Sequence, residues 1–196
     1  MKRPFGEAHV IAVTTGLTLV ELLVGMVLGL VGAAATTALL RVGVAAWTRA
    51  GAAAEVTSEV ADGVDQLVRD VRLAGYDPTA SASPGLILIA ADRIELTADL
   101  DGNGTIDASS EERVAYRVAP SSRSLQRVVG AQSLPIVSDV ATGGLVLGYF
   151  DRAGTRLDPA AAGTAAATRV VTIDLTATPR GRPAVRVSAG ARLVNR

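Results

Sequence analysis

The chain has no cysteine, and its only lysine and only histidine, Lys2 and His9, both lie near the N-terminus. The lack of cysteine excludes disulfides and thiol catalysis. Because histidine and lysine are absent from the rest of the chain, Ser-His and Cys-His catalysis, histidine-rich zinc sites and Schiff-base chemistry are excluded there. There is no P-loop, and no G-x-G-x-x-G motif follows a predicted strand. We therefore expect a protein that is not an enzyme.

Aromatic residues are also scarce, and charge is unevenly divided. Aromatics make up 3% of the chain, which leaves few surfaces for stacking nucleic-acid bases. Residues 51–112 contain 13 acidic and 3 basic residues, whereas residues 113–196 contain 4 acidic residues and 12 arginines. We favour complementary packing within one fold, with solvated charged faces. The alternatives are head-to-tail contacts between subunits and nucleic-acid binding by the basic half.

What the N-terminal part has instead is a long apolar segment. The chain is 49% hydrophobic with a mean hydropathy of +0.36, and residues 22–40 are 19 consecutive uncharged residues. At about 1.5 Å per residue, a helix of this length nearly crosses a hydrocarbon core of about 30 Å. Lys2 and Arg3 precede the segment and are expected to stay cytoplasmic, so the C-terminal bulk is exported. One carboxylate, Glu21, stands where the segment begins.

The sequence "GLTLVELLV" at residues 16–24 indicates how the N-terminus is processed. A secretory signal has its small-residue cleavage site after the apolar segment, but Gly16 lies before it. The stretch resembles the class III signal of type IV prepilins and type II secretion pseudopilins, although Leu17 stands where Phe is more frequent. The resemblance implies that a prepilin peptidase cuts between Gly16 and Leu17 and that the Leu17 amine is methylated. It further implies that Glu21 pairs with the N-terminal amine of a neighbouring subunit.

Three further stretches carry a looser resemblance, to W-type minor pilins and J-type minor pseudopilins. They are "RDVRLAGYDP" at residues 69–78, "YFDRAG" at residues 149–154 and "ARLVNR" at residues 191–196. The resemblance implies a minor subunit held in the inner membrane, with its head in the periplasm or outside. Its partners would be other major and minor pilins, in a type IV pilus or a secretion pseudopilus whose assembly it initiates, caps or modifies. The alternatives are a DNA-binding minor pilin of an uptake pilus and an uncleaved, signal-anchored periplasmic domain.

Beyond Arg41 the pattern becomes amphipathic and then changes to strands. Valine and leucine recur at helical spacing from Val56 to Val71, and Gly75 and Pro78 are typical of a helix end. The expected fold class is α+β and pilin-like: a long N-terminal helix spans the membrane with its first half and packs with its second half on a mainly antiparallel sheet. The predicted segments are a leader at 1–16, a transmembrane helix at 17–40, an amphipathic helix at 41–76 and a β-rich head at 77–196.

Within the head, a linker at 77–85 precedes short runs of alternating apolar and polar residues. A segment rich in alanine, at 157–168, is predicted to be a surface loop. The alternating runs predict strands at 86–90, 94–97, 113–118, 124–129, 145–150, 169–176 and 184–193.

An acidic loop, residues 99–112, is a candidate calcium site. Oxygen-bearing side chains alternate along it, as in an EF-hand-type loop, and Gly104 permits a sharp bend. The candidate ligands are Asp99, Asp101, Asn103, Thr105 and Asp107.

The end of the acidic loop departs from the calcium-loop pattern. The twelfth position, where a bidentate Glu is expected, is Ser110, and Glu111 and Glu112 follow it, too late unless the loop bulges. The alternative is a polar hairpin tip built from Asx turns and glycines. If calcium binds, its role is to brace the hairpin. A pair of carboxylates can also hydrolyse a glycoside, but these acids gather in one loop with turn residues instead of lining a cleft.

Overall fold

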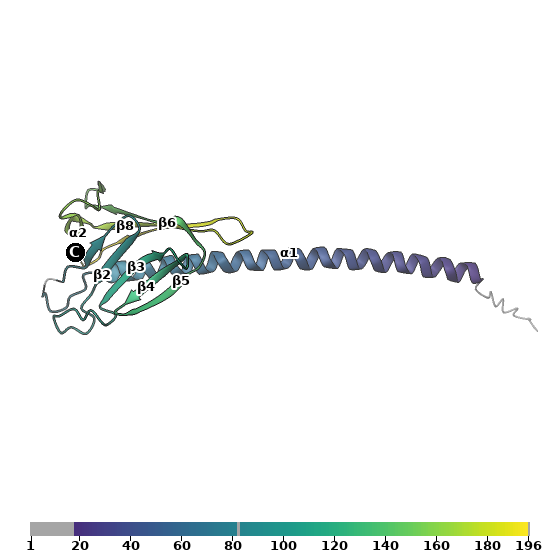
Figure 1. Cartoon of the computed structure of the whole chain (residues 1–196), viewed down its shortest axis with the longest axis horizontal. Helices are drawn as coiled ribbons and strands as arrows, with labels where there is room; N and C mark the ends of the chain where they lie inside the picture. The colour runs from purple at the N-terminus through teal and green to yellow at the C-terminus, as the bar shows by residue number, and fades with distance from the viewer. Residues whose placement is uncertain (1–17, 82, 196) are drawn as a thin grey trace, which may run out of the picture. The chain divides into compact units, whose positions relative to one another are not determined.

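The computed structural model describes residues 18–81 and 83–195 (Figure 1). The predicted leader at 1–16 and the predicted cleavage site between Gly16 and Leu17 therefore lie outside the described residues. The chain divides into two compact units, residues 1–50 and residues 51–196. One helix, α1 (Leu19–Leu73), has residues in both units.

The described part of the first unit is the apolar half of α1. An 18-residue window of this helix has a mean hydropathy of 2.1, and none of it is buried. The described residues thus contain one helix that is long and apolar enough to cross a membrane, and a signal sequence has the same properties.

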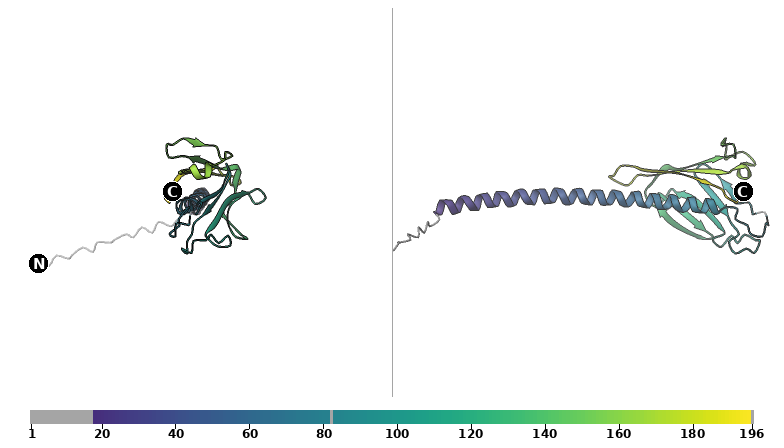
Figure 2. Two further views of the ribbon diagram at one scale, coloured as in Figure 1. Left: turned by 90° about the vertical axis from the view of Figure 1, so that its left-hand side faces the viewer. Right: turned by 180° about the vertical axis from the view of Figure 1, so that it is seen from behind.

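The second unit contains two antiparallel sheets. Figure 2 shows them on different sides of the second half of α1. A short helix, α2 (Thr164–Ala167), lies between β7 and β8 in the chain. The first sheet has the order β1 (Leu86–Ile89), β2 (Arg93–Thr97), β3 (Arg113–Ala119), β4 (Ser124–Val129), β5 (Gln132–Val137). The second has the order β7 (Arg156–Leu157), β6 (Val140–Phe150), β8 (Val170–Ala177), β9 (Val185–Arg192).

The hydrophobic core lies where the second half of α1 meets both sheets. The apolar stripe predicted from helical spacing is confirmed: Val60, Val64, Leu67, Val68 and Val71 are buried. They belong to one cluster with buried residues of both sheets, such as Tyr116 of β3 and Tyr149 of β6. Because this stripe recurs every three to four residues, one face of the helix supplies a continuous surface for the sheets.

The α+β fold class is confirmed, and three details differ from the sequence predictions. The single predicted sheet is two sheets. Strand β5 was not predicted, because Pro135 and a largely exposed pattern obscure it; a proline is tolerated there because β5 is an edge strand. The segment at 157–168, predicted to be a loop, contains the end of β7 and the short helix α2.

Gly63 lets α1 approach the first sheet closely. A Cβ atom at this position would collide with Cγ2 of Val137 on β5. We therefore expect Gly63→Ala to lower the free energy of unfolding of the full chain in detergent by about 1–3 kcal/mol, although Ala is the better helix former. Chemical denaturation followed by circular dichroism measures this.

Gly51→Ala is the matched control, because nothing lies within 4 Å of the added Cβ. It should leave stability unchanged or raise it by about 0.5–1 kcal/mol. Equal effects of the two substitutions would contradict the close approach.

Candidate functional site

The described N-terminal end of α1 is capped by Thr18. The backbone N–H of Glu21 donates to the Thr18 hydroxyl at 3.2 Å, and the helix begins at Leu19. Thr followed three residues later by Glu is the capping-box arrangement. Glu21 therefore lies in the first turn, where the helix dipole favours a negative charge.

Glu21 is exposed and is the only charged residue in the apolar half of α1 before Arg41. Its own side chain makes no ion pair with any described residue. The two processing residues, Gly16 and Leu17, lie outside the described residues. The pairing of Glu21 with a neighbour's amine stays a prediction, and within the described chain its carboxylate is available for such a partner.

Two carboxylates organise the acidic loop from within. Asp99 is 0% exposed and Glu112 is 5% exposed. The backbone N–H groups of Gly102 and Gly104 each donate to Asp99 at 2.9 Å. Those of Leu100, Asp101 and Asp107 donate to Glu112 at 2.8–3.2 Å.

These amide donors favour the charged carboxylates. The Asp107 amide first, and then the Asp101 amide, hold the pKa of Glu112 below its ordinary value. The pKa of Asp107 is likewise lowered, chiefly by a hydrogen bond from the Ser109 hydroxyl. Backbone N–H groups thus take the place of water around these two buried carboxylates. This is the arrangement expected of a hairpin tip built from Asx turns.

The structure brings together some of the predicted calcium ligands. Carboxylate oxygens of Asp99, Asp101 and Glu112 lie within 4.8 Å of one another. Glu112 was set aside in the sequence analysis as too late in the loop, and the loop folds back far enough to include it. The other predicted ligands make local contacts: Asn103 accepts from the Thr105 amide at 2.7 Å, and Asp107 accepts from the Ser109 amide at 2.8 Å.

Calcium binding by the acidic loop stays a prediction, with a direct test. The midpoint of thermal unfolding of the full chain should rise with calcium concentration. A ligand that binds only the folded state adds about 2.7 kcal/mol to the free energy of unfolding when its concentration is a hundredfold above Kd. Asp101→Asn should abolish the rise, whereas Asp158→Asn, at an exposed acid outside the loop, should not. A midpoint that does not change with calcium would contradict the calcium site and support the alternative, a hairpin tip built from Asx turns and glycines.

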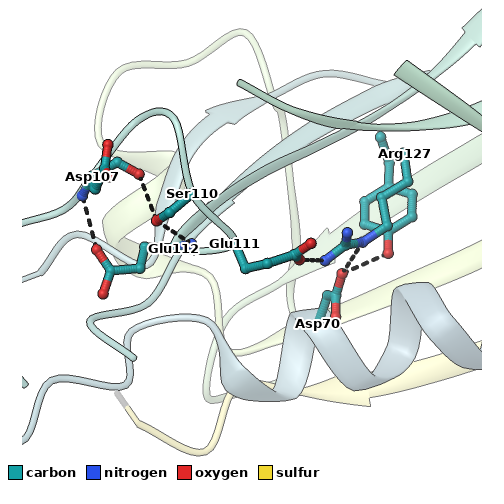
Figure 3. Close-up of polar contacts among 7 residues, drawn as sticks. Asp70, Asp107, Ser110, Glu111, Glu112 and Arg127 are labelled. Atoms are coloured by element: carbon teal, nitrogen blue, oxygen red, sulfur yellow. Dashed lines mark hydrogen bonds and ion pairs between the residues drawn. The ribbon is translucent and has the colours of Figure 1, made fainter. Parts of the chain in front are cut away.

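A second polar cluster joins α1 to the first sheet and to the acidic loop. Asp70 of α1 accepts from the Tyr116 hydroxyl at 2.6 Å and from Nε of Arg127 at 3.0 Å. Figure 3 shows Arg127 between the carboxylates of Asp70 and Glu111, and it pairs with both. Arg127 lowers the pKa of Glu111, while burial followed by the nearby Asp70 charge raises the pKa of Tyr116. Sequence analysis did not identify this cluster, because its members come from four separate segments.

The arginines of the basic half are divided between the two sheets. Arg117 belongs to β3 of the first sheet, and Arg192 to β9 of the second. Among the described residues of this half, the arginines in ion pairs are Arg113, Arg123, Arg127 and Arg186. This distribution matches the complementary packing favoured in the sequence analysis better than one continuous basic strip.

No family model matches the chain, and no curated protein matches it. The fold of the described residues still indicates a type of architecture. A long apolar N-terminal helix, packed by its second half on antiparallel sheets, is a pilin-like arrangement.

Proposed function

We propose that this chain is a minor pilin or minor pseudopilin, a subunit that initiates, caps or modifies a type IV pilus or secretion pseudopilus. The observation that carries the proposal is a lone acid, Glu21, in the first turn of an apolar helix, five residues after Gly16. Prepilin peptidase would cut after Gly16, and the Leu17 amine would be methylated. Until assembly the subunit would rest in the inner membrane, with its head periplasmic or extracellular.

The chemistry of Glu21 supports this reading. A carboxylate costs roughly 2.5–3.5 kcal/mol at the centre of a membrane helix on insertion scales. The first-turn position and the helix dipole offset part of that cost. The rest is offset when a cationic group binds the carboxylate. A free Leu17 amine on an adjoining subunit supplies such a cation, and cleavage at Gly16 creates it.

The direct test is mass spectrometry of the N-terminus of the protein purified from its own membrane. We expect the mature chain to begin with N-methylated Leu17. Gly16→Val should block cleavage and leave the intact leader. A mature chain that begins at Met1 or Lys2 would refute the proposal and support the uncleaved, signal-anchored domain.

The remaining alternative is a DNA-binding minor pilin. It requires the arginines of the basic half to act together, and affinity for duplex DNA would then fall steeply with salt. The division of these arginines between two sheets and the ion pairs of four of them favour assembly over DNA binding. We propose a non-catalytic role in either case.

A further inference from the structure

The hairpin between β8 and β9 presents two arginines without acidic partners. Its tip, residues 178–184, reads "TPRGRPA", and Arg180 and Arg182 are exposed. Among the described residues, no carboxylate lies within 4.0 Å of either guanidinium. Gly181 between them has a φ of 72°, which turns the chain tightly and keeps both side chains at the tip.

This hairpin tip lies at one end of the second unit, and the acidic loop lies at the other. Nη1 of Arg182 donates to the carbonyl of Ala52, which is among the first helical residues of this unit. The Asp99 amide donates to the carbonyl of Tyr76, just beyond the end of α1. In Figure 1 the β8–β9 hairpin, in yellow, extends beside α1. The tip of the β8–β9 hairpin thus presents its two arginines at one end of the second unit, whereas the acidic loop lies at the other end, the end that also holds Arg169 and Arg192.

The end of the unit with the hairpin tip is also the end closest in the chain to the apolar segment. Ala52 follows Leu40 by only 12 residues in the chain. The only charged residues between them are Arg41 and Arg49, and the first acid after Ala52 is Glu55. Trp47, 82% exposed, lies in the same stretch, and tryptophan is typical of the zone where a membrane helix leaves the bilayer.

We propose that Arg180 and Arg182 bind the headgroups of anionic phospholipids at the surface of the membrane that holds the apolar segment. The inference rests on the proposed membrane-anchored state. A guanidinium pairs with phosphate oxygens through two N–H groups. Each arginine near an anionic membrane surface raises the partition coefficient of the segment from water to the membrane about fivefold. Binding through these two arginines places the hairpin tip at the lipid surface and leaves the acidic loop, at the other end of the second unit, away from it.

The absence of cysteine permits a site-specific test on the full chain. A fluorophore is attached to Ala184→Cys beside the hairpin tip, and in a second preparation to Ala108→Cys in the acidic loop; both positions are exposed. Each protein is reconstituted in nanodiscs whose lipids carry headgroup nitroxides. The nanodiscs contain phosphatidylcholine alone or phosphatidylcholine with phosphatidylglycerol.

We expect the Ala184→Cys label to be quenched in phosphatidylglycerol nanodiscs, at least twofold more than in phosphatidylcholine alone and more than the Ala108→Cys label. The double variant R180Q/R182Q should lose this difference. The matched variant R152Q/R156Q, at exposed arginines of the β6–β7 hairpin, should keep it. High salt should reduce the quenching, because the Debye length shrinks from about 10 Å at 0.1 M to about 3 Å at 1 M.

Equal quenching of the two labels, or quenching that survives R180Q/R182Q, would overturn the inference. If these arginines instead supplied a salt-dependent affinity for duplex DNA, the hairpin would belong to nucleic-acid binding and the lipid assignment would fall. Extraction of the chain from native membranes with alkaline carbonate tests the anchor separately. A chain that resists extraction but shows no hairpin quenching overturns only this inference, whereas a chain that is extracted overturns the membrane-anchored state on which it rests.

Discussion

Replacement of Glu21 by Gln should abolish incorporation of this subunit into filaments while leaving its synthesis, cleavage and membrane insertion intact. Gln keeps the size of the side chain and lowers the cost of membrane insertion, so the variant should anchor at least as well as the natural chain. It cannot form a charge-assisted bond with a cationic chain end, and loss of one such bond leaves the partner's charge unpaired in an apolar surrounding. We expect incorporation to fall by more than tenfold, measured by immunoblotting of sheared filaments against membranes.

Glu55→Gln provides the matched control. It removes the same charge from the same helix at an exposed position, beyond the apolar segment, and should leave incorporation unchanged. Glu21→Asp, with its charge on a shorter side chain, should be intermediate. Full incorporation of the Glu21→Gln subunit would refute the role assigned to this carboxylate.

Replacement of Arg127 by Leu should lower the free energy of unfolding of the full chain by about 3 kcal/mol, since one partner of a buried pair is lost and its acids are left unpaired. Its side chain is 11% exposed and lies between Asp70, 17% exposed, and Glu111. Of these two acids, Asp70 is the more buried, since the Glu111 side chain is 60% exposed, and Asp70 also holds α1 to the first sheet. Denaturant titration of the chain in detergent measures the loss.

Arg113→Leu is the control for this prediction. Arg113 lies on the adjacent strand β3 and pairs with Glu95, but its side chain is 43% exposed. An exposed pair contributes about 0–1 kcal/mol, so little stability should be lost. Tyr116→Phe, which removes only the hydroxyl that donates to Asp70, should cost about 1 kcal/mol. If Arg127→Leu and Arg113→Leu lowered the free energy of unfolding by similar amounts, the burial of Arg127 would not increase its contribution to stability.

The predictions that succeeded rest on periodic patterns in contiguous sequence. The apolar stripe of α1 could be read from spacing alone, because a helix brings every third or fourth residue to one face. Strand β4 was located with its observed bounds, since a turn and an alternating run enclose it. Strand β5 was missed for the opposite reason: most of its side chains are exposed, so its sequence carries little burial pattern.

The candidate site divides in the same way. Glu21 was recognisable because a single charge interrupts an apolar run. The inclusion of Glu112 with Asp99 and Asp101 depends on how the loop doubles back. The contact between Arg182 and the helix carbonyl of Ala52 joins residues that are 130 positions apart.

By itself, the sequence determined the membrane-length helix, the amphipathic face after it and the α+β class, because each depends on residues that are neighbours in the chain. The processing signal before the helix stays a prediction. Only the tertiary structure decided that the head contains two sheets, that Asp70, Arg127 and Glu111 form one cluster, and that the tip of the β8–β9 hairpin and the acidic loop occupy opposite ends of one unit. These arrangements depend on which distant segments pack together, and that choice is made by the burial of the whole core, not by any local pattern.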